Sequence, residues 1–161
     1  MRPPASESPA ELAHRFETGL VSREEFGHRE FLLVVAWLLL TDDEARATER
    51  IVSAMRRLER SGRGVRQPGT ARVTGPARRG YNETITLFWI GVASRTLPPR
   101  VSRAGQVDAS NAFASRFARH PDLIYEYYSP HRVHSLEARM KWIEPDLRAL
   151  DTFERVPSGG D

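Results

Sequence analysis

Two short polar segments lie within otherwise apolar stretches of the chain, and their side chains are of types that transfer protons. The first contains His28, whose imidazole has an ordinary pKa of about 6.5 and is therefore a base near neutral pH. The second runs from Tyr81 through Asn82 and Glu83. We expect these four residues to be catalytic and to face one common cavity. The alternatives are a backbone partner for His28 and a helix-capping role for Asn82.

The residues around the second segment predict a site for an anion. Arg78 and Arg79 come directly before it, and the free N–H groups at the start of a helix attract negative charge. We therefore expect Arg78, Arg79 and Thr84 to bind the anionic group of a substrate, with an arginine at the mouth of the cavity. Because nearby arginines lower a carboxylate pKa, Glu83 suits orientation or ion pairing better than strong base catalysis. The alternative is that Asn82 or Thr84 caps the helix while Glu83 complements its dipole.

Arg139 is a further candidate for binding the anionic group. It stands in the last predicted helix, where an ion pair with Glu137 or Asp146 would be an equally good role. Aromatic side chains nearby could line a pocket, but such clusters in small helical proteins more often belong to the core (Tyr125, Tyr127, Tyr128).

Several segments together resemble a family of small uncharacterised bacterial all-helical proteins. They are Phe26-Gly27-His28-Arg29-Glu30-Phe31-Leu32, Gly80-Tyr81-Asn82-Glu83-Thr84-Ile85-Thr86, Tyr127-Tyr128-Ser129, Ala138-Arg139 and Pro145-Asp146. The family's motifs read F/W-T-H-x-x-H-L and G-Y-H-E-T-I-T, and the similarity extends over residues 16–150. The resemblance implies the fold more than a function, since no activity is established for the family. Phe31 and Asn82 replace two of the family's three histidines, and only His28 is kept.

Metal and cofactor binding are not expected. The chain has no cysteine, and the pair His131 and His134 lacks the companions that a zinc site needs. Phe31 and Asn82 stand where the resemblance would place further histidines. No glycine-rich nucleotide loop and no HExxH motif occurs. The sequence therefore predicts a site without metal and without a standard cofactor.

Helix signals recur along the whole chain. Capping boxes beginning at Ser8, Ser22 and Thr41 predict three helix starts, and apolar residues follow at i, i+3 and i+4 spacing. The third helix is expected to carry Ala45, Thr48, Val52, Met55 and, with Ile51, Leu58 on one face. Further helices are expected near residues 81–97, 109–119, 122–128 and 136–142. The sequence thus predicts an all-α, compact single-domain helical bundle of about five to seven helices, with residues 31–40 in the most buried one.

The segments outside the helices differ in composition. Residues 1–7 are predicted to be a disordered N-terminus, residues 8–150 the helical domain with an Arg/Gly/Pro loop at 63–80, and residues 151–161 a flexible tail. Residues 61–107 contain eight arginines and one acidic residue. No basic-then-apolar leader opens the chain, and the longest apolar run is shorter than the roughly 18–20 residues that span a bilayer. We expect a soluble, cytoplasmic protein.

Three functions are compatible with these features. The first is a small metal-independent enzyme, or an enzyme subunit, acting on an anionic small molecule in bacterial specialised metabolism by proton transfer, elimination or cyclisation. The second is a non-catalytic protein whose arginine-rich face docks an acidic partner, such as a catalytic subunit. Nucleic-acid binding comes last, because the net charge is only +3 and no recognition motif is present.

Overall fold

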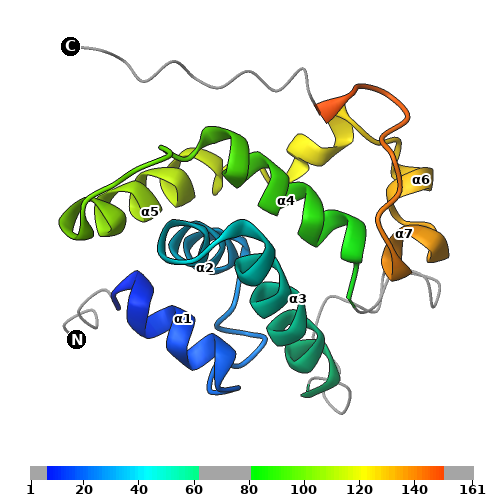
Figure 1. The fold of residues 1–161 in the computed structure, drawn as a ribbon. Helices are drawn as coiled ribbons and strands as arrows, with labels where there is room; N and C mark the ends of the chain where they lie inside the picture. The colour runs from blue at the N-terminus through cyan, green and yellow to red at the C-terminus, as the bar shows by residue number, and fades with distance from the viewer. Residues whose placement is uncertain (1–6, 62–80, 151–161) are drawn as a thin grey trace.

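The computed structural model describes residues 7–61 and 81–150, which form helices and no strand (Figure 1). The helices are α1 (Pro9–Glu17), α2 (His28–Thr41), α3 (Glu44–Ser61), α4 (Glu83–Thr96), α5 (Arg103–Phe117), the 3-10 helix η3 (Pro121–Glu126), α6 (Pro130–Val133) and α7 (Leu136–Met140). The predicted all-α single-domain bundle is confirmed. The expected disorder at 1–6, the loop at 63–80 with Arg78 and Arg79, and the tail at 151–161 lie outside the described residues.

The start of α1 follows its predicted capping box. The Ser8 hydroxyl accepts a hydrogen bond from the Glu11 N–H (3.2 Å), and the Glu11 carboxylate accepts one from the Ser8 N–H (3.1 Å). Two N–H groups that a helix start leaves unpaired are thereby satisfied. After the helix, Gly19 has a φ of +76°, a conformation that favours glycine.

The second helix begins later than its predicted capping box. The box at residues 22–25 forms, but it closes only a turn. Gly27 follows in an extended conformation, and α2 begins at the next residue, His28. The Glu30 carboxylate accepts a hydrogen bond from the Gly27 N–H (3.1 Å). The fifth helix, in contrast, begins earlier than predicted, because the Ser102 hydroxyl caps it by accepting from the Gly105 N–H (3.1 Å).

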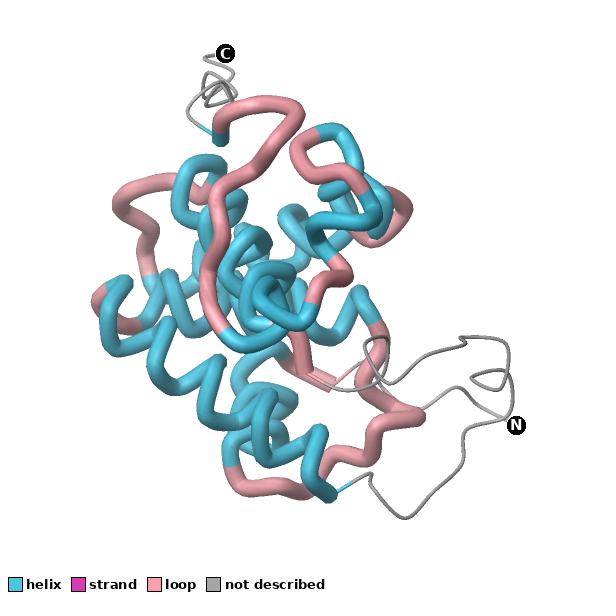
Figure 2. The backbone as a smooth tube through the Cα atoms, turned by 90° about the vertical axis from the view of Figure 1, so that its right-hand side faces the viewer, coloured by secondary structure: helices cyan, strands magenta, loops and turns pink. Residues whose placement is uncertain are grey.

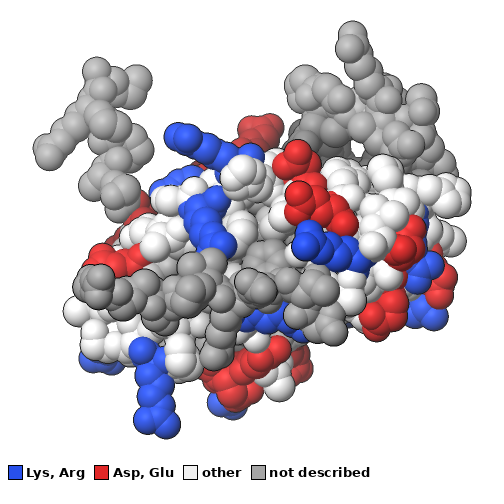
Figure 3. All heavy atoms as spheres, turned by 90° about the horizontal axis from the view of Figure 1, so that it is seen from above, with Lys and Arg blue, Asp and Glu red and all other residues white. Residues whose placement is uncertain are grey.

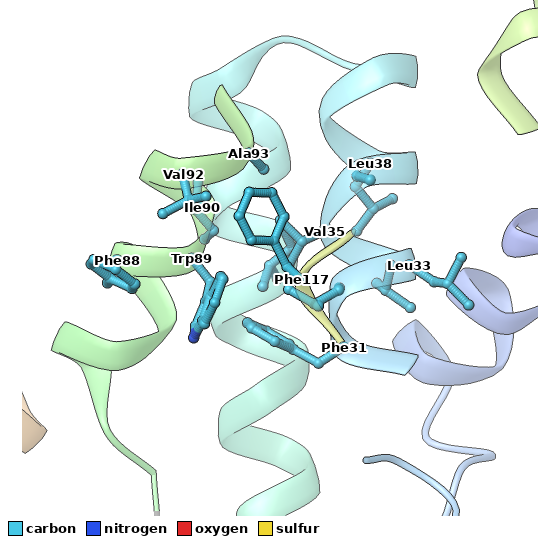
Figure 4. Close-up of a cluster of buried hydrophobic side chains, with 14 of the residues drawn as sticks. Phe31, Leu33, Val35, Leu38, Phe88, Trp89, Ile90, Val92, Ala93 and Phe117 are labelled. Atoms are coloured by element: carbon cyan, nitrogen blue, oxygen red, sulfur yellow. The ribbon is translucent and has the colours of Figure 1, made fainter. Parts of the chain in front are cut away.

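The core is built around α2, which contacts α1, α3, α4 and α5 (Figure 1). Its residues 31–36 and Leu38 are buried, and Leu32, Val34, Val35 and Ala36 are fully so. Figure 4 shows Phe31, Trp89 and Phe117, from α2, α4 and α5, meeting at the centre of this core. Burying one large apolar side chain contributes about 1.5–3 kcal/mol, so α2 is the main source of hydrophobic stabilisation.

The buried face of α3 differs from the predicted one. Ala47, Ile51 and Ala54 are buried, whereas Ala45 is exposed and Thr48 is only half-buried. The two small alanine side chains let α3 approach its neighbours closely, and α3 contacts α1, α2 and α4. Ile51 was predicted correctly, and Met55 and Leu58 pack against the core, but Ala47 and Ala54 were missed and Ala45 was wrongly included.

The segment from η3 to residue 150 covers one face of α4. Short turns and loops join η3, α6 and α7, as Figure 2 shows. Tyr127 and Tyr128 pack with their rings 5.5 and 6.4 Å from that of Phe88. The last helix, α7, ends at Met140, two residues before the predicted end.

Candidate functional site

His28 lies half-buried at the start of α2, against α4 and α5. Its ring makes an edge contact with the Trp89 ring, at 4.8 Å between centroids. Its Nε2 lies 3.2 Å from the carbonyl oxygen of Phe117, and because a carbonyl only accepts, Nε2 carries the hydrogen. The neutral ring therefore has its lone pair on Nδ1. Burial lowers the pKa of His28, and the bond to Phe117 partly opposes this shift.

Tyr81 lies just before α4, and its hydroxyl is buried. This hydroxyl forms no well-aligned hydrogen bond with a described residue, but the side chains of Thr86 and Glu83 lie within hydrogen-bonding reach of it. Burial raises the pKa of Tyr81 to about 12, and the Glu83 carboxylate adds to the rise while Thr86 and Arg56 oppose it. At neutral pH the hydroxyl thus keeps its proton, and the Glu83 carboxylate is an acceptor within its reach.

Asn82 is the N-cap of α4 and also ties α4 to α6. Its side-chain oxygen accepts from the Ile85 N–H (3.0 Å), and its amide donates to the Val133 carbonyl (2.8 Å). The Thr84 hydroxyl is fully buried and donates to the Lys141 carbonyl (2.7 Å). Both side chains therefore hold the C-terminal segment onto α4.

Glu83 forms an ion pair with Arg56 of α3. The Arg56 Nη2 donates to Glu83 Oε1 at 2.6 Å, and the Arg56 guanidinium also lies over the Tyr81 ring, 5.5 Å from its centroid. The Glu83 side chain is 15% exposed and the Arg56 side chain 52%. One charged pair and one unpartnered hydroxyl thus share the corner between α3 and the first turn of α4.

The two predicted polar segments meet the same stripe of α4. Thr86, beside the Tyr81 hydroxyl, and Trp89, against His28, are three residues apart and are neighbours on the helix surface. His28 and Tyr81 thus contact side chains that are three residues apart on α4. Asn82 and Thr84 direct their hydrogen bonds to α6 and to the residue after α7 instead.

The other predicted residues are spread over the molecule. Arg139 is half-buried on α7, while Glu137 pairs with Lys141 (3.1 Å) and Asp146 accepts from Ser129. Tyr127 and Tyr128 belong to the core. Tyr125 is exposed, and its hydroxyl lies 2.8 Å from Nε2 of His134.

The surface hollows formed by described residues lie away from the predicted site residues. Three surface hollows formed by described residues have volumes of 660, 460 and 160 Å³, and none is lined by His28, Tyr81, Asn82 or Glu83. The common cavity thus stays a prediction. On the face seen in Figure 3, basic and acidic side chains are intermixed, and uncharged surface lies between the charged groups. In the described ranges, no three His, Asp or Glu side chains gather as metal ligands would, and no helix is long and apolar enough to cross a bilayer.

Sequence reasoning missed Arg56 and the Phe117 carbonyl. Arg56 is one of many arginines in the chain, stands 27 residues before Glu83, and meets it only through helix packing. The Phe117 carbonyl belongs to the backbone, so the residue type does not indicate that it binds His28. No family model, no curated protein and no solved structure matches the chain.

Proposed function

We propose that the protein binds an anionic small molecule beside Tyr81 and transfers a proton on it, as a metal-independent enzyme of the bacterial cytoplasm. The observation behind the proposal is the buried Tyr81 hydroxyl without a described hydrogen-bond partner. Leaving a buried polar group unsatisfied costs about 1–3 kcal/mol, so native proteins rarely do it without a reason. A ligand oxygen that accepts from this hydroxyl removes the cost.

Tyr81 acts as the hydrogen-bond donor. With a pKa of about 12 its hydroxyl stays protonated at neutral pH, so it favours a ligand atom that carries or develops negative charge. Such a donor, fixed in a site that excludes water, stabilises the oxyanion formed when a proton leaves the substrate.

His28 acts as the base. The Phe117 carbonyl holds the proton on Nε2, and the lowered pKa keeps the ring neutral, so the Nδ1 lone pair is ready to take a proton. In the proposed step a proton moves from the substrate to Nδ1 while negative charge gathers on a substrate oxygen beside Tyr81. His28 has a lowered pKa and serves as the base, and Tyr81 has a raised pKa and serves as the donor. Enzymes that transfer protons commonly combine two groups whose pKa values are shifted in opposite directions.

The test is a binding screen of small carboxylic acids and phosphate esters, followed by nuclear magnetic resonance of the His28 and Tyr81 side chains. We expect binders to shift both sets of resonances, and Tyr81→Phe to weaken binding by roughly tenfold, the value of a charge-assisted hydrogen bond. Tyr125→Phe, at an exposed hydroxyl, is the matched control. Binders that shift neither residue, or that bind Tyr81→Phe unchanged, would exclude the proposal.

A second candidate function is partner binding, favoured by α7. Leu136 and Met140 are 64% and 69% exposed and lie one helical turn apart on the same face. Exposed apolar side chains of this size are typical of contact surfaces. Under this alternative a protein partner, such as a catalytic subunit, would lose affinity for a Leu136→Ser, Met140→Ser variant, whereas Tyr81→Phe would leave the complex unchanged.

A further inference from the structure

We propose that Arg56 is the residue that recognises the anionic group of the ligand, and that it does so by exchanging its partner Glu83 for a carboxylate or phosphate; this rests on the proposed function. Arg56 lies on α3, outside both polar sequence segments. The ligand class is therefore a small molecule with a carboxylate or phosphate group next to the atom that loses the proton.

The first argument is the unused hydrogen-bonding capacity of Arg56. Its guanidinium has five N–H groups in a planar fork that matches two oxygens of a carboxylate. Only Nη2 forms a hydrogen bond to a side chain, the one to Glu83 Oε1, and the remaining N–H groups have no partner among the described residues. The side chain is half-exposed, so an ion from solvent can reach it.

The second argument is the position of the guanidinium. It lies over the Tyr81 ring, 5.5 Å from the ring centroid, in the same corner as the unpartnered hydroxyl. An anion bound to this guanidinium therefore lies close to the Tyr81 ring.

The third argument concerns Glu83, which has a source of stabilisation besides Arg56. It is the first residue of α4, where the helix dipole stabilises a negative charge. The dipole therefore continues to stabilise the Glu83 carboxylate when Arg56 turns to a ligand. In the ligand-free protein Glu83 is then a competitor for the guanidinium, and its removal must strengthen anion binding.

The experiment titrates the full chain with benzoate and with inorganic phosphate, followed by chemical-shift changes of the Tyr81 ring and the Arg56 side chain. Arg56→Gln should weaken binding by roughly tenfold or more. Arg57→Gln is the matched control: it removes the same charge from the next position of α3, where Arg57 donates to the Glu17 carbonyl (2.8 Å). Glu83→Gln should tighten binding several-fold, with circular dichroism verifying that each variant folds.

A purely structural Arg56–Glu83 pair predicts a different pattern. Equal weakening by Arg56→Gln and Arg57→Gln would show a general charge effect and overturn the inference. Unchanged or weaker anion binding by Glu83→Gln would overturn the inference as well. So would titrations in which the chemical shifts of the Tyr81 ring change neither in the wild-type protein nor in Glu83→Gln.

The two proposals fail in different ways. If Arg56→Gln loses the anion and Tyr81→Phe does not, Arg56 is an anion site but the function proposed for Tyr81 is wrong. If Tyr81→Phe loses the anion and Arg56→Gln keeps it, the function stands and the role of Arg56 is excluded.

Discussion

The two sides of α4 treat their buried polar groups differently. On the side facing α6 and α7, which we call the closed side, the Tyr128 hydroxyl donates to the Ile143 carbonyl at 2.6 Å and the Thr84 hydroxyl is likewise paired. On the side facing α2 and α3, the open side, the Tyr81 hydroxyl has no described partner and Arg56 uses a single N–H for side-chain bonding. Of two buried tyrosine hydroxyls, one thus forms a well-aligned hydrogen bond with the described chain and the other does not.

The contrast shows why residue type alone does not mark a site. Asn82, Thr84 and Tyr128 are as polar as Tyr81, but their donors and acceptors are used by the chain itself. Such fully paired groups stabilise the packing of one segment on another. An unpaired group destabilises the free protein, and a ligand that pairs it removes that cost.

The largest effect is expected at Asn82, on the closed side. Asn82→Ala removes the cap of α4 and leaves the Val133 carbonyl without its donor, which should cost about 2–3 kcal/mol in the free energy of unfolding. Urea unfolding at neutral pH measures it. Asn82→Asp separates the two contributions, because it keeps the acceptor for the Ile85 N–H but sets a carboxylate oxygen against the Val133 carbonyl. A loss below about 0.5 kcal/mol for Asn82→Ala would contradict the paired state of the closed side.

The sequence predicted the fold better than the site. Helix starts with local signals, such as Ser8 with Glu11, were predictable because a cap involves residues three positions apart. The buried face of α3 was not, because its alanines are buried only through close packing against other helices. Residue spacing does indicate that Asn82 is a cap, but whether its amide meets Val133 depends on tertiary structure.

The site was predicted only as a set of residue types. His28 and Tyr81 stood out because they interrupt apolar segments. Their partners, Arg56 and the Phe117 carbonyl, come from other helices, and no local pattern links them. The long-range packing of α3 and α5 decides which polar groups are paired, and this information is not in the motifs.

The matched pair Tyr128→Phe and Tyr81→Phe tests the comparison directly, with a smaller effect. Tyr128→Phe leaves the buried Ile143 carbonyl without a donor and should cost about 1–2 kcal/mol. Tyr81→Phe removes a buried hydroxyl that has no well-aligned partner among the described residues, so the free energy of unfolding should rise by about 1 kcal/mol, the lower end of the cost of an unsatisfied buried group. Equal losses in urea unfolding would mean that both hydroxyls are paired, and the open side would lose its distinction.

The smallest effect is a difference in pH dependence between the two sides. Burial holds the pKa of His28, on the open side, below its ordinary value of 6.5. Above pH 6.5 the ring is neutral in both the folded and the unfolded chain, and folding is not penalised. As the pH falls below 6.5, the unfolded chain takes up the proton first, so stability declines until the pH has passed the folded pKa.

The closed side titrates in a lower range. Hydrogen bonds from the Ser129 hydroxyl and N–H hold the pKa of Asp146 below its ordinary value of 3.8. Its contribution to stability is complete above pH 3.8 and is lost only as the pH falls through the folded pKa. Urea midpoints measured between pH 8 and pH 3 (roughly the range in which these groups titrate) should therefore show two separate declines. His28→Gln should remove the upper decline, and Asp146→Asn should weaken the lower one, to which the lowered pKa of Glu25 also contributes. If His28→Gln leaves the upper decline in place, His28 is not the group that titrates there, and the neutral base on the open side is excluded.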